Sequence, residues 1–233
     1  DKLTACPTAN MSILEYQLSY WRHLPHIQPP GAIIFVTFRL AGSIPTTIQE
    51  QLLAEAAAIK QRIDAIADAQ KQAELSYQEQ KRLFGRWDAA LDRATTGPHW
   101  LREPQIAQLL WDSLLYRDGK VYDLDSFCIM SNHAHAVFRP LLKAGEQYHS
   151  LSAIMHSLKG YTAREANTIL GRKGQFWQHE SYDHVVRNEA ELARIRRYVL
   201  QNPVTAGLVA HWDEWPWSYS KTIAAKEVGG EAN

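Results

Sequence analysis

Short stretches in which apolar and polar residues alternate predict the strands of a sheet. Residues 32–40, AIIFVTFRL, are rich in β-branched and aromatic residues and follow a Pro-Pro-Gly turn signal. The apolar positions recur at every second residue, so this strand should cover a core with one side and leave Arg39 on an open sheet face. These apolar positions are Ile34, Val36, Phe38 and Leu40.

Two later apolar stretches, KVYDLDSFCIM and HAHAVFRP, are joined by Ser131 and Asn132. Such a short polar link favours an antiparallel hairpin. The segment YDHVVR has the same character and predicts a short fourth strand.

Apolar residues at spacings of three and four predict helices between the strands. In residues 46–97, Ala, Gln, Glu, Lys and Arg dominate, which predicts an inserted helical hairpin with a weak break near Leu75 and Ser76. We expect no chemistry from this insertion. Further helices are predicted from Pro104 to Asp118, over residues 150–170, and from Glu189 to Gln201 with Pro203 and Gly207 as terminators.

The order of these elements predicts the fold class. A strand, the insertion, a helix, two strands, a helix, a strand and a last helix make a βαββαβ unit with an extra C-terminal helix. We therefore expect an α+β protein of ferredoxin-like or RRM-like type, with an antiparallel sheet and helices on one face. One domain should span residues 1–233, with the helical hairpin insertion at 46–97 and a C-terminal tail at 208–233. In that tail Trp212, Trp215 and Trp217 should fasten the chain to the domain.

Composition excludes several classes of protein but does not identify a binding partner. The 25 basic residues equal the 25 acidic ones, and a zero net charge neither demands nor excludes a nucleic acid. Cys6 and Cys128 are too few for a disulfide framework or a cysteine zinc site. No apolar run approaches the roughly 18 residues of a membrane span, and the first residues lack the pattern of a signal peptide. We expect a soluble intracellular protein with no membrane partner.

The first candidate for chemistry is the pair His133 and His135. Residues two apart on a strand share a face and lie about 6 to 7 Å from each other. Two neutral imidazoles on one rigid strand form half of a site for a divalent metal. The alternative is a pair of half-buried structural histidines, and no third histidine lies at short range in the sequence.

The second candidate is Tyr198 with Asn202, four residues apart on a helix and so on one face. Alternatively, the tyrosine belongs to the core and the asparagine caps the helix before a proline. Arg194, Arg196 and Arg197 come just before Tyr198, and nearby cations can stabilise a phenolate. Two histidines, a tyrosine and an amide oxygen are the groups needed for metal-assisted attack on a phosphodiester with a covalent tyrosine intermediate.

The segments that carry these residues resemble a known family. With its six matching segments spread in order from His23 to Ser220, the chain resembles the REP-associated tyrosine transposases, relatives of the single-tyrosine IS200/IS605 transposases of the HUH nuclease superfamily. The segments are HLPHIQPPGAIIFVTFRL, MSNHAHAVFRP, SLKGYTAREAN, GQFWQHESYDHVVRN, YVLQNPVTAGLV and WPWSYS.

The resemblance implies a function for each of these residues. His133, His135 and Asn202 would bind Mg²⁺ or Mn²⁺, and Tyr198, on the extra helix, would be the nucleophile. Such enzymes cut single-stranded DNA next to a hairpin through a 5′-phosphotyrosine bond and can rejoin the strands. Tyr161, with Glu165 four residues later, is the alternative nucleophile. The alternative functions are a domesticated hairpin-binding protein without cleavage and a metal-dependent hydrolase of small phosphoesters.

Basic and aromatic residues in the later part of the chain are the expected contacts for DNA. Phe176, Trp177 and Tyr182 would either stack on unpaired bases or pack in the core. The expected partner is single-stranded, REP-like hairpin DNA, bound by a monomer rather than a homodimer in the bacterial cytoplasm, at the nucleoid. The expected DNA-binding residues are Arg39, Lys159, Arg164, Arg172, Lys173, Arg187, Arg194 and Arg197.

Overall fold

A five-stranded antiparallel sheet forms the centre of the protein. The structure, a computed structural model, describes residues 29–144 and 147–222, so the expectations for Cys6 and for the motif residues before 29 lie outside the described residues. The strands lie in the order β4-β1-β3-β2-β5, and every neighbouring pair is antiparallel. The first four of these positions follow the ferredoxin-like order, which confirms the predicted fold class. The strands are β1 (Ile33–Arg39), β2 (Tyr122–Ile129), β3 (His133–Pro140), β4 (Tyr182–Val186) and β5 (Ser218–Ser220).

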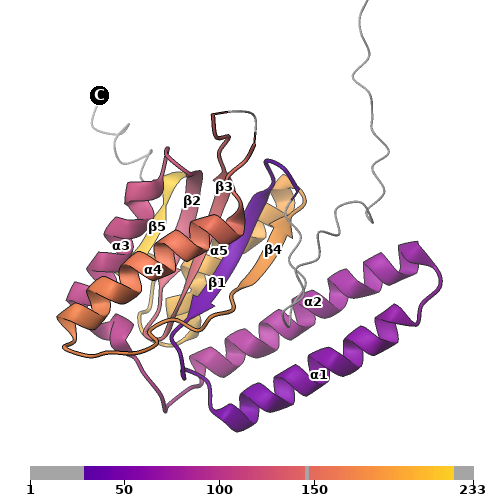
Figure 1. Cartoon of the computed structure of the whole chain (residues 1–233), viewed down its shortest axis with the longest axis horizontal. Helices are drawn as coiled ribbons and strands as arrows, with labels where there is room; N and C mark the ends of the chain where they lie inside the picture. Colours follow the sequence, from indigo (N-terminus) through magenta and orange to yellow (C-terminus); the bar gives the residue numbers. More distant parts are fainter. Residues whose placement is uncertain (1–28, 145–146, 223–233) are drawn as a thin grey trace, which may run out of the picture.

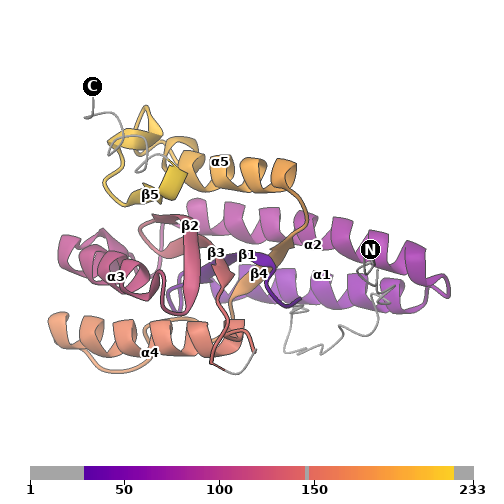
Figure 2. The ribbon, with the colours of Figure 1, turned by 90° about the horizontal axis from the view of Figure 1, so that it is seen from above.

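The two helices of the βαββαβ unit, α3 (Pro104–Arg117) and α4 (Leu151–Ile169), lie on one face of the sheet, as expected (Figures 1 and 2). The alternating apolar residues of β1 lie in the main core on this side, where they meet Leu110, Leu114 and Leu158 of the two helices. Among the described residues, no helix combines the length and the apolarity that a membrane crossing requires.

The opposite face of the sheet is also covered, which the sequence did not lead us to expect. The extra helix α5 (Glu189–Thr205) lies across it, and Phe35, Val137 and Val199 belong to a second apolar cluster there. The prediction that Arg39 stands on an open face is wrong, because its side chain meets the helical insertion and is only 7% exposed.

The insertion is a pair of helices, α1 (Thr46–Asp64) and α2 (Ala69–Asp92), whose turn projects away from the sheet (Figure 1). The break lies at residues 65–68, so the predicted break at Leu75 and Ser76 is wrong. Asp68 sets the start of α2 because its side chain accepts hydrogen bonds from the backbone N–H groups of Gln70 and Lys71. Leu75 and Ser76 lie inside α2, where neither residue type stops a helix.

The C-terminal part departs from the prediction in two ways. Pro203 lies inside α5, which continues to Thr205: the proline removes one backbone hydrogen bond, and the N–H groups of Ala206 and Gly207 still close the last turn on the carbonyls of Asn202 and Val204. The segment expected as a tail adds the edge strand β5 to β2. Trp215 donates from Nε1 to the carbonyl of Ile129 at 3.0 Å, and Trp217 packs against the main core. These two tryptophans fasten the segment to the domain.

Glu191, in the first turn of α5, ties the insertion to the sheet. Its carboxylate, 3% exposed, accepts hydrogen bonds from the Tyr77 hydroxyl of α2 and from the Arg187 N–H, and lies 3.2 Å from His184 Nε2. Burial alone would raise the pKa of Glu191, but these hydrogen bonds outweigh it and hold the pKa at about 2.

We expect Glu191→Gln to lower the free energy of unfolding at pH 7 by about 2 kcal/mol. Because the folded pKa lies below the unfolded value of about 4.3, the carboxylate stabilises the fold fully above that pH and loses this effect as the pH falls towards 2. Urea unfolding at pH 7 and near pH 2 measures the difference. Glu189→Gln, an exposed site in the same turn, is the control. An equal loss at both pH values would contradict the prediction.

Candidate active site

His133 and His135 lie side by side on the central strand β3. The exposed fractions are 1% for His133 and 0% for His135, and their Nε2 atoms are 3.1 Å apart. The intervening Ala134 belongs to the main core on the opposite face, so both imidazoles project towards the side that α5 covers. The structure therefore brings the two histidines together on one rigid element.

The neighbours of the imidazoles fix which ring nitrogens face each other. His133 Nδ1 is 2.7 Å from Asn132 Oδ1, and Asn132 donates from Nδ2 to the carbonyl of Leu91, which fixes the orientation of the amide. Because Oδ1 can only accept, His133 carries its proton on Nδ1 and presents a lone pair at Nε2. Thr37 Oγ1 lies 2.7 Å from His135 Nδ1, within hydrogen-bond distance, and holds the direction of that ring.

Both imidazoles are neutral in this environment. Burial lowers the pKa of His135 to about 3. The pKa of His133 is also lowered to about 3, by burial and then by the neighbouring His135, against the opposing charge of Asp88. Neutral imidazoles with converging lone pairs are the form that binds a metal ion.

A carboxylate from the insertion completes this cluster. Asp88, on α2, is 5% exposed, and its Oδ1 lies 3.4 Å from His135 Nε2 and 3.9 Å from His133 Nε2. The ligand atoms of these three residues lie within 4.8 Å of one another, close enough to hold one ion. The insertion, from which we expected no chemistry, therefore contributes a candidate metal ligand. Nothing in the local sequence separates Asp88 from the solvated acidic residues of the same helices.

Asn202, on α5, reaches the cluster from the other side. Its Nδ2 is 3.2 Å from His135 Nε2, and turning the amide over would bring Oδ1 to that position. Asp92 Oδ1 lies 4.0 Å from His133 Nε2, and burial followed by the charge of Asp88 raises the pKa of Asp92 to about 7.

Buried oxygen atoms without a hydrogen-bond partner test whether a cation fits this cluster. Within the described residues, Oδ1 of Asp88, of Asp92 and of Asn202 are all buried without a hydrogen-bond partner. Buried oxygens of this kind are costly unless something pairs with them. Oxygen and imidazole donors without thiolates suit Mg²⁺ or Mn²⁺, so the residues present fit such an ion.

Tyr198 lies at the edge of the same cluster. Its hydroxyl donates a hydrogen bond to Asp88 Oδ2, and its ring centroid is 5.6 Å from that of His135. Burial and then the negative charge of Asp88 raise the pKa of Tyr198. The expectation that neighbouring arginines stabilise its phenolate is wrong: Arg196 pairs with Asp125, and Arg194 and Arg197 are exposed.

The alternative tyrosine is remote from the histidines. Tyr161 is 43% exposed on α4, which covers the opposite face of the sheet, and the guanidinium of Arg164 lies 5.6 Å from the centre of its ring. Glu165, the carboxylate proposed to accompany it, pairs with Arg164. The structure thus groups Tyr198 with the histidines and leaves Tyr161 outside.

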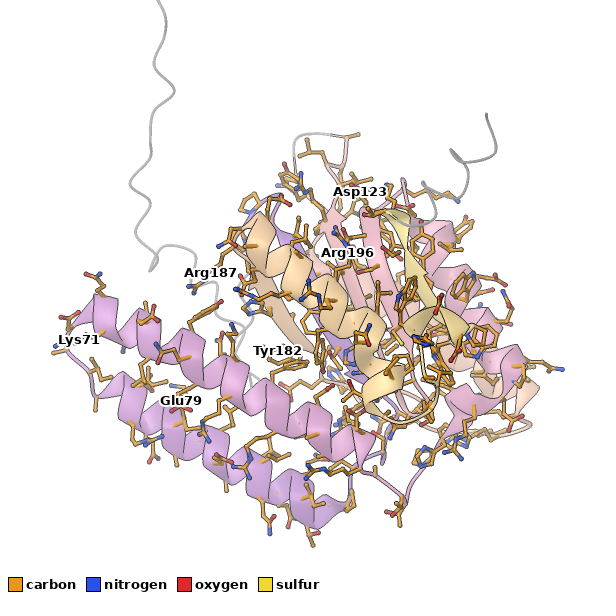
Figure 3. All side chains as sticks on the ribbon, turned by 180° about the vertical axis from the view of Figure 1, so that it is seen from behind. Lys71, Glu79, Asp123, Tyr182, Arg187 and Arg196 are labelled. Atoms are coloured by element: carbon orange, nitrogen blue, oxygen red, sulfur yellow. The ribbon has the colours of Figure 1, made fainter. Side chains whose placement is uncertain are left out.

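The basic residues expected to contact DNA do not form one surface. Arg39 and Lys159 point into the protein: Lys159 donates to the carbonyls of Gln178 and His179, and burial followed by the charge of Arg39 lowers its pKa to about 7. The others fall into two groups on opposite faces of the sheet (Figures 2 and 3). Arg164, Arg172 and Lys173 belong to α4 and the loop after it, whereas Arg187, Arg194 and Arg197 lie before or on α5.

The aromatic residues expected to stack on bases or to pack in the core also fall into two groups. Phe176 and Trp177 are 1% and 5% exposed and belong to the main core, so packing is the correct interpretation for them. Tyr182 is partly exposed and lies between α5 and the insertion, where its ring stacks on Phe84 with centroids 4.3 Å apart (Figure 3).

The fold and this cluster define a class of protein: an α+β sheet whose central strand carries a histidine pair facing a tyrosine on a C-terminal helix. Residues 112–202 match the family model described as IS200-like transposase. That segment contains His133, His135, Tyr198 and Asn202 but excludes Asp88. The resemblance inferred from the sequence is confirmed there.

A solved structure shares the fold over almost the whole chain. It is that of a REP-associated tyrosine transposase bound to a REP hairpin, with 14% sequence identity, a TM-score of 0.53 and coverage of 91% of this chain and 89% of the other. No match was found among curated proteins. At this identity the likeness concerns the fold.

Proposed function

We propose that the protein is a metal-dependent single-tyrosine DNA endonuclease and strand transferase that acts on single-stranded DNA next to REP-type hairpins. The observation that carries this proposal is the Tyr198 hydroxyl, hydrogen-bonded into the same buried cluster as the two imidazoles. The match to IS200-like transposases over the segment that contains these residues supports it. We also propose that the protein acts as a monomer on DNA in the bacterial cytoplasm.

His133, His135, Asp88 and Asn202 would hold the divalent cation, Mg²⁺ or Mn²⁺. When bound, the cation supplies Lewis-acid polarisation of the scissile phosphate. The protein fixes the direction of the imidazoles through Asn132 and Thr37, and it excludes water from them by burial.

The chain's own groups then account for the bond changes. Tyr198 keeps its proton until reaction because its pKa is raised, and Asp88 Oδ2 accepts the hydrogen bond from its hydroxyl. As the phenolic oxygen attacks phosphorus, Asp88 takes the proton; the bond from phosphorus to the 3′-oxygen breaks, and that oxygen leaves and gains a proton. The products are a 5′-phosphotyrosine and a free 3′-hydroxyl. The covalent bond retains the phosphodiester energy, so the step can reverse onto another strand.

The test is incubation with single-stranded REP-type hairpin oligonucleotides in Mg²⁺ or Mn²⁺, followed by a denaturing gel. We expect a covalent protein–DNA band that requires the metal and disappears in EDTA. Tight hairpin binding without a band in either metal would replace this proposal with the binding protein that does not cleave. Turnover of a small phosphodiester without any DNA adduct would indicate the small-molecule hydrolase.

A further inference from the structure

A cavity lies beside the metal cluster, between strand β1, the helical insertion and the segment that leads into β4. Its volume is about 130 Å³, whereas one water needs about 10 to 15 Å³. The cavity therefore has room for a flat ring system. The lining includes Arg39, Gln49, Phe84, Trp87, Glu180 and Tyr182.

Arg39 is a buried cation in the lining of this cavity. Its guanidinium donates to Ser43 Oγ at 3.3 Å and to Gln49 Oε1 at 3.0 Å, and its carbon lies 5.6 Å from the ring centroid of Trp87. These contacts fix the plane of the guanidinium and engage only part of its N–H donors. A 7% exposed arginine held in this way is prepared to bind a planar acceptor.

The walls of the cavity are aromatic, and one of them carries an unsatisfied donor. Phe84, Trp87 and Tyr182 supply flat apolar surfaces of the kind on which unpaired bases stack. Trp87 Nε1 is buried and has no hydrogen-bond partner within the described part of the chain. A buried indole N–H without a partner calls for an acceptor, which a bound ligand would provide.

Two residues connect the cavity to the cluster at which the DNA would be cut. Thr37 lines the cavity and also lies against His135 Nδ1, and Asp88 lines the cavity and also accepts from Tyr198. A group in the cavity is therefore a close neighbour of the scissile phosphate.

We propose that this cavity binds one unpaired guanine of the single-stranded DNA, adjacent to the cleaved phosphodiester, a proposal that rests on the proposed function. Guanine presents the acceptors O6 and N7 on one edge, which match the paired N–H donors of the Arg39 guanidinium. Adenine lacks the O6 acceptor, and the pyrimidines lack N7. Arg39 therefore acts as a specificity residue inside the fold rather than as a phosphate contact on an open sheet.

The experiment measures binding of a hairpin oligonucleotide whose unpaired flank contains only thymine except for one guanine, moved along it one position at a time. Fluorescence anisotropy in EDTA avoids cleavage. We expect one position at which guanine lowers the dissociation constant at least about tenfold. Adenine or 7-deazaguanine at that position should lose most of the gain. Arg39→Lys should abolish the guanine preference, whereas Arg62→Lys, an exposed site on α1, should keep it.

Because the base substitutions use the unaltered protein, the test does not depend on whether Arg39→Lys folds. Intact hairpin binding with no base preference at any position, or with a preference for another base, overturns the guanine pocket and leaves the proposed function standing. Absence of hairpin binding overturns both. Persistence of the guanine preference in a folded Arg39→Lys protein also overturns the pocket.

Discussion

Tyr198→Phe is expected to abolish the covalent protein–DNA adduct, with a loss of at least about 10³-fold in the rate of its formation. The substitution removes the phenolic oxygen, which is the only atom of this side chain that can bond to phosphorus, and keeps the ring that packs near Phe35 and Phe84. Single-turnover incubation with a labelled hairpin and Mn²⁺, resolved on a denaturing gel, measures the adduct. Hairpin affinity in EDTA should stay within about twofold, since neutral packing is preserved.

Tyr161→Phe is the matched control, because it makes the same chemical change at a tyrosine on the opposite face of the sheet. It should form the adduct at the rate of the unaltered protein. An adduct that persists in Tyr198→Phe and is lost in Tyr161→Phe would assign the nucleophile to α4, and the cluster around Asp88 would then need another explanation.

The second large effect is expected for Asp88→Asn. It removes the charged oxygens that face the two imidazoles and the tyrosine, so the affinity for Mn²⁺ should fall at least about tenfold, as for other groups that tune a metal site. Calorimetric titration with Mn²⁺ and the metal-induced rise in melting temperature measure this without reference to cleavage. The metal-free protein should be at least as stable as before, because burial raises the pKa of Asp88 and an amide avoids burying the charge.

Glu79→Gln is the control for this substitution, since it removes one negative charge from the same helix where Glu79 pairs with Arg82. It should leave Mn²⁺ binding unchanged. A lower melting temperature of metal-free Asp88→Asn together with unchanged Mn²⁺ affinity would make Asp88 a structural residue and contradict the metal site.

Local patterns in the sequence predicted the parts of the fold that local patterns control. The alternation in residues 32–40 and in HAHAVFRP predicted the strands β1 and β3, and the polar link Ser131-Asn132 predicted that β2 pairs antiparallel with β3. The same period placed His133 and His135 on one face, and the helical period placed Tyr198 above Asn202. These relations span a few residues, so periodicity alone contains them.

The remaining features depend on contacts between distant segments, which periodicity does not contain. Asp88 is one acidic residue among many in the insertion, and only the packing of α2 beside β3 and α5 brings it to the imidazoles. The burial of Arg39 has the same origin, because a strand pattern cannot show which helix covers its second face. The short strand β5 forms only through pairing with β2, and a segment of three residues carries no period of its own.

The residues of this cluster lie far apart in the sequence, so they are not all present while the chain is being synthesised. The hydrogen bond between Tyr198 and Asp88 joins residues 110 positions apart, and Tyr198 is synthesised after Asp88 and both histidines. A nascent chain that ends just after β3 contains both imidazoles but not helix α5. The edge position beside β1 is then still empty, because β4 has not been synthesised. Protein synthesis runs from the N-terminus, so a product truncated before α5 carries the histidines without Tyr198. On the proposed function, such a product would form no covalent bond with DNA.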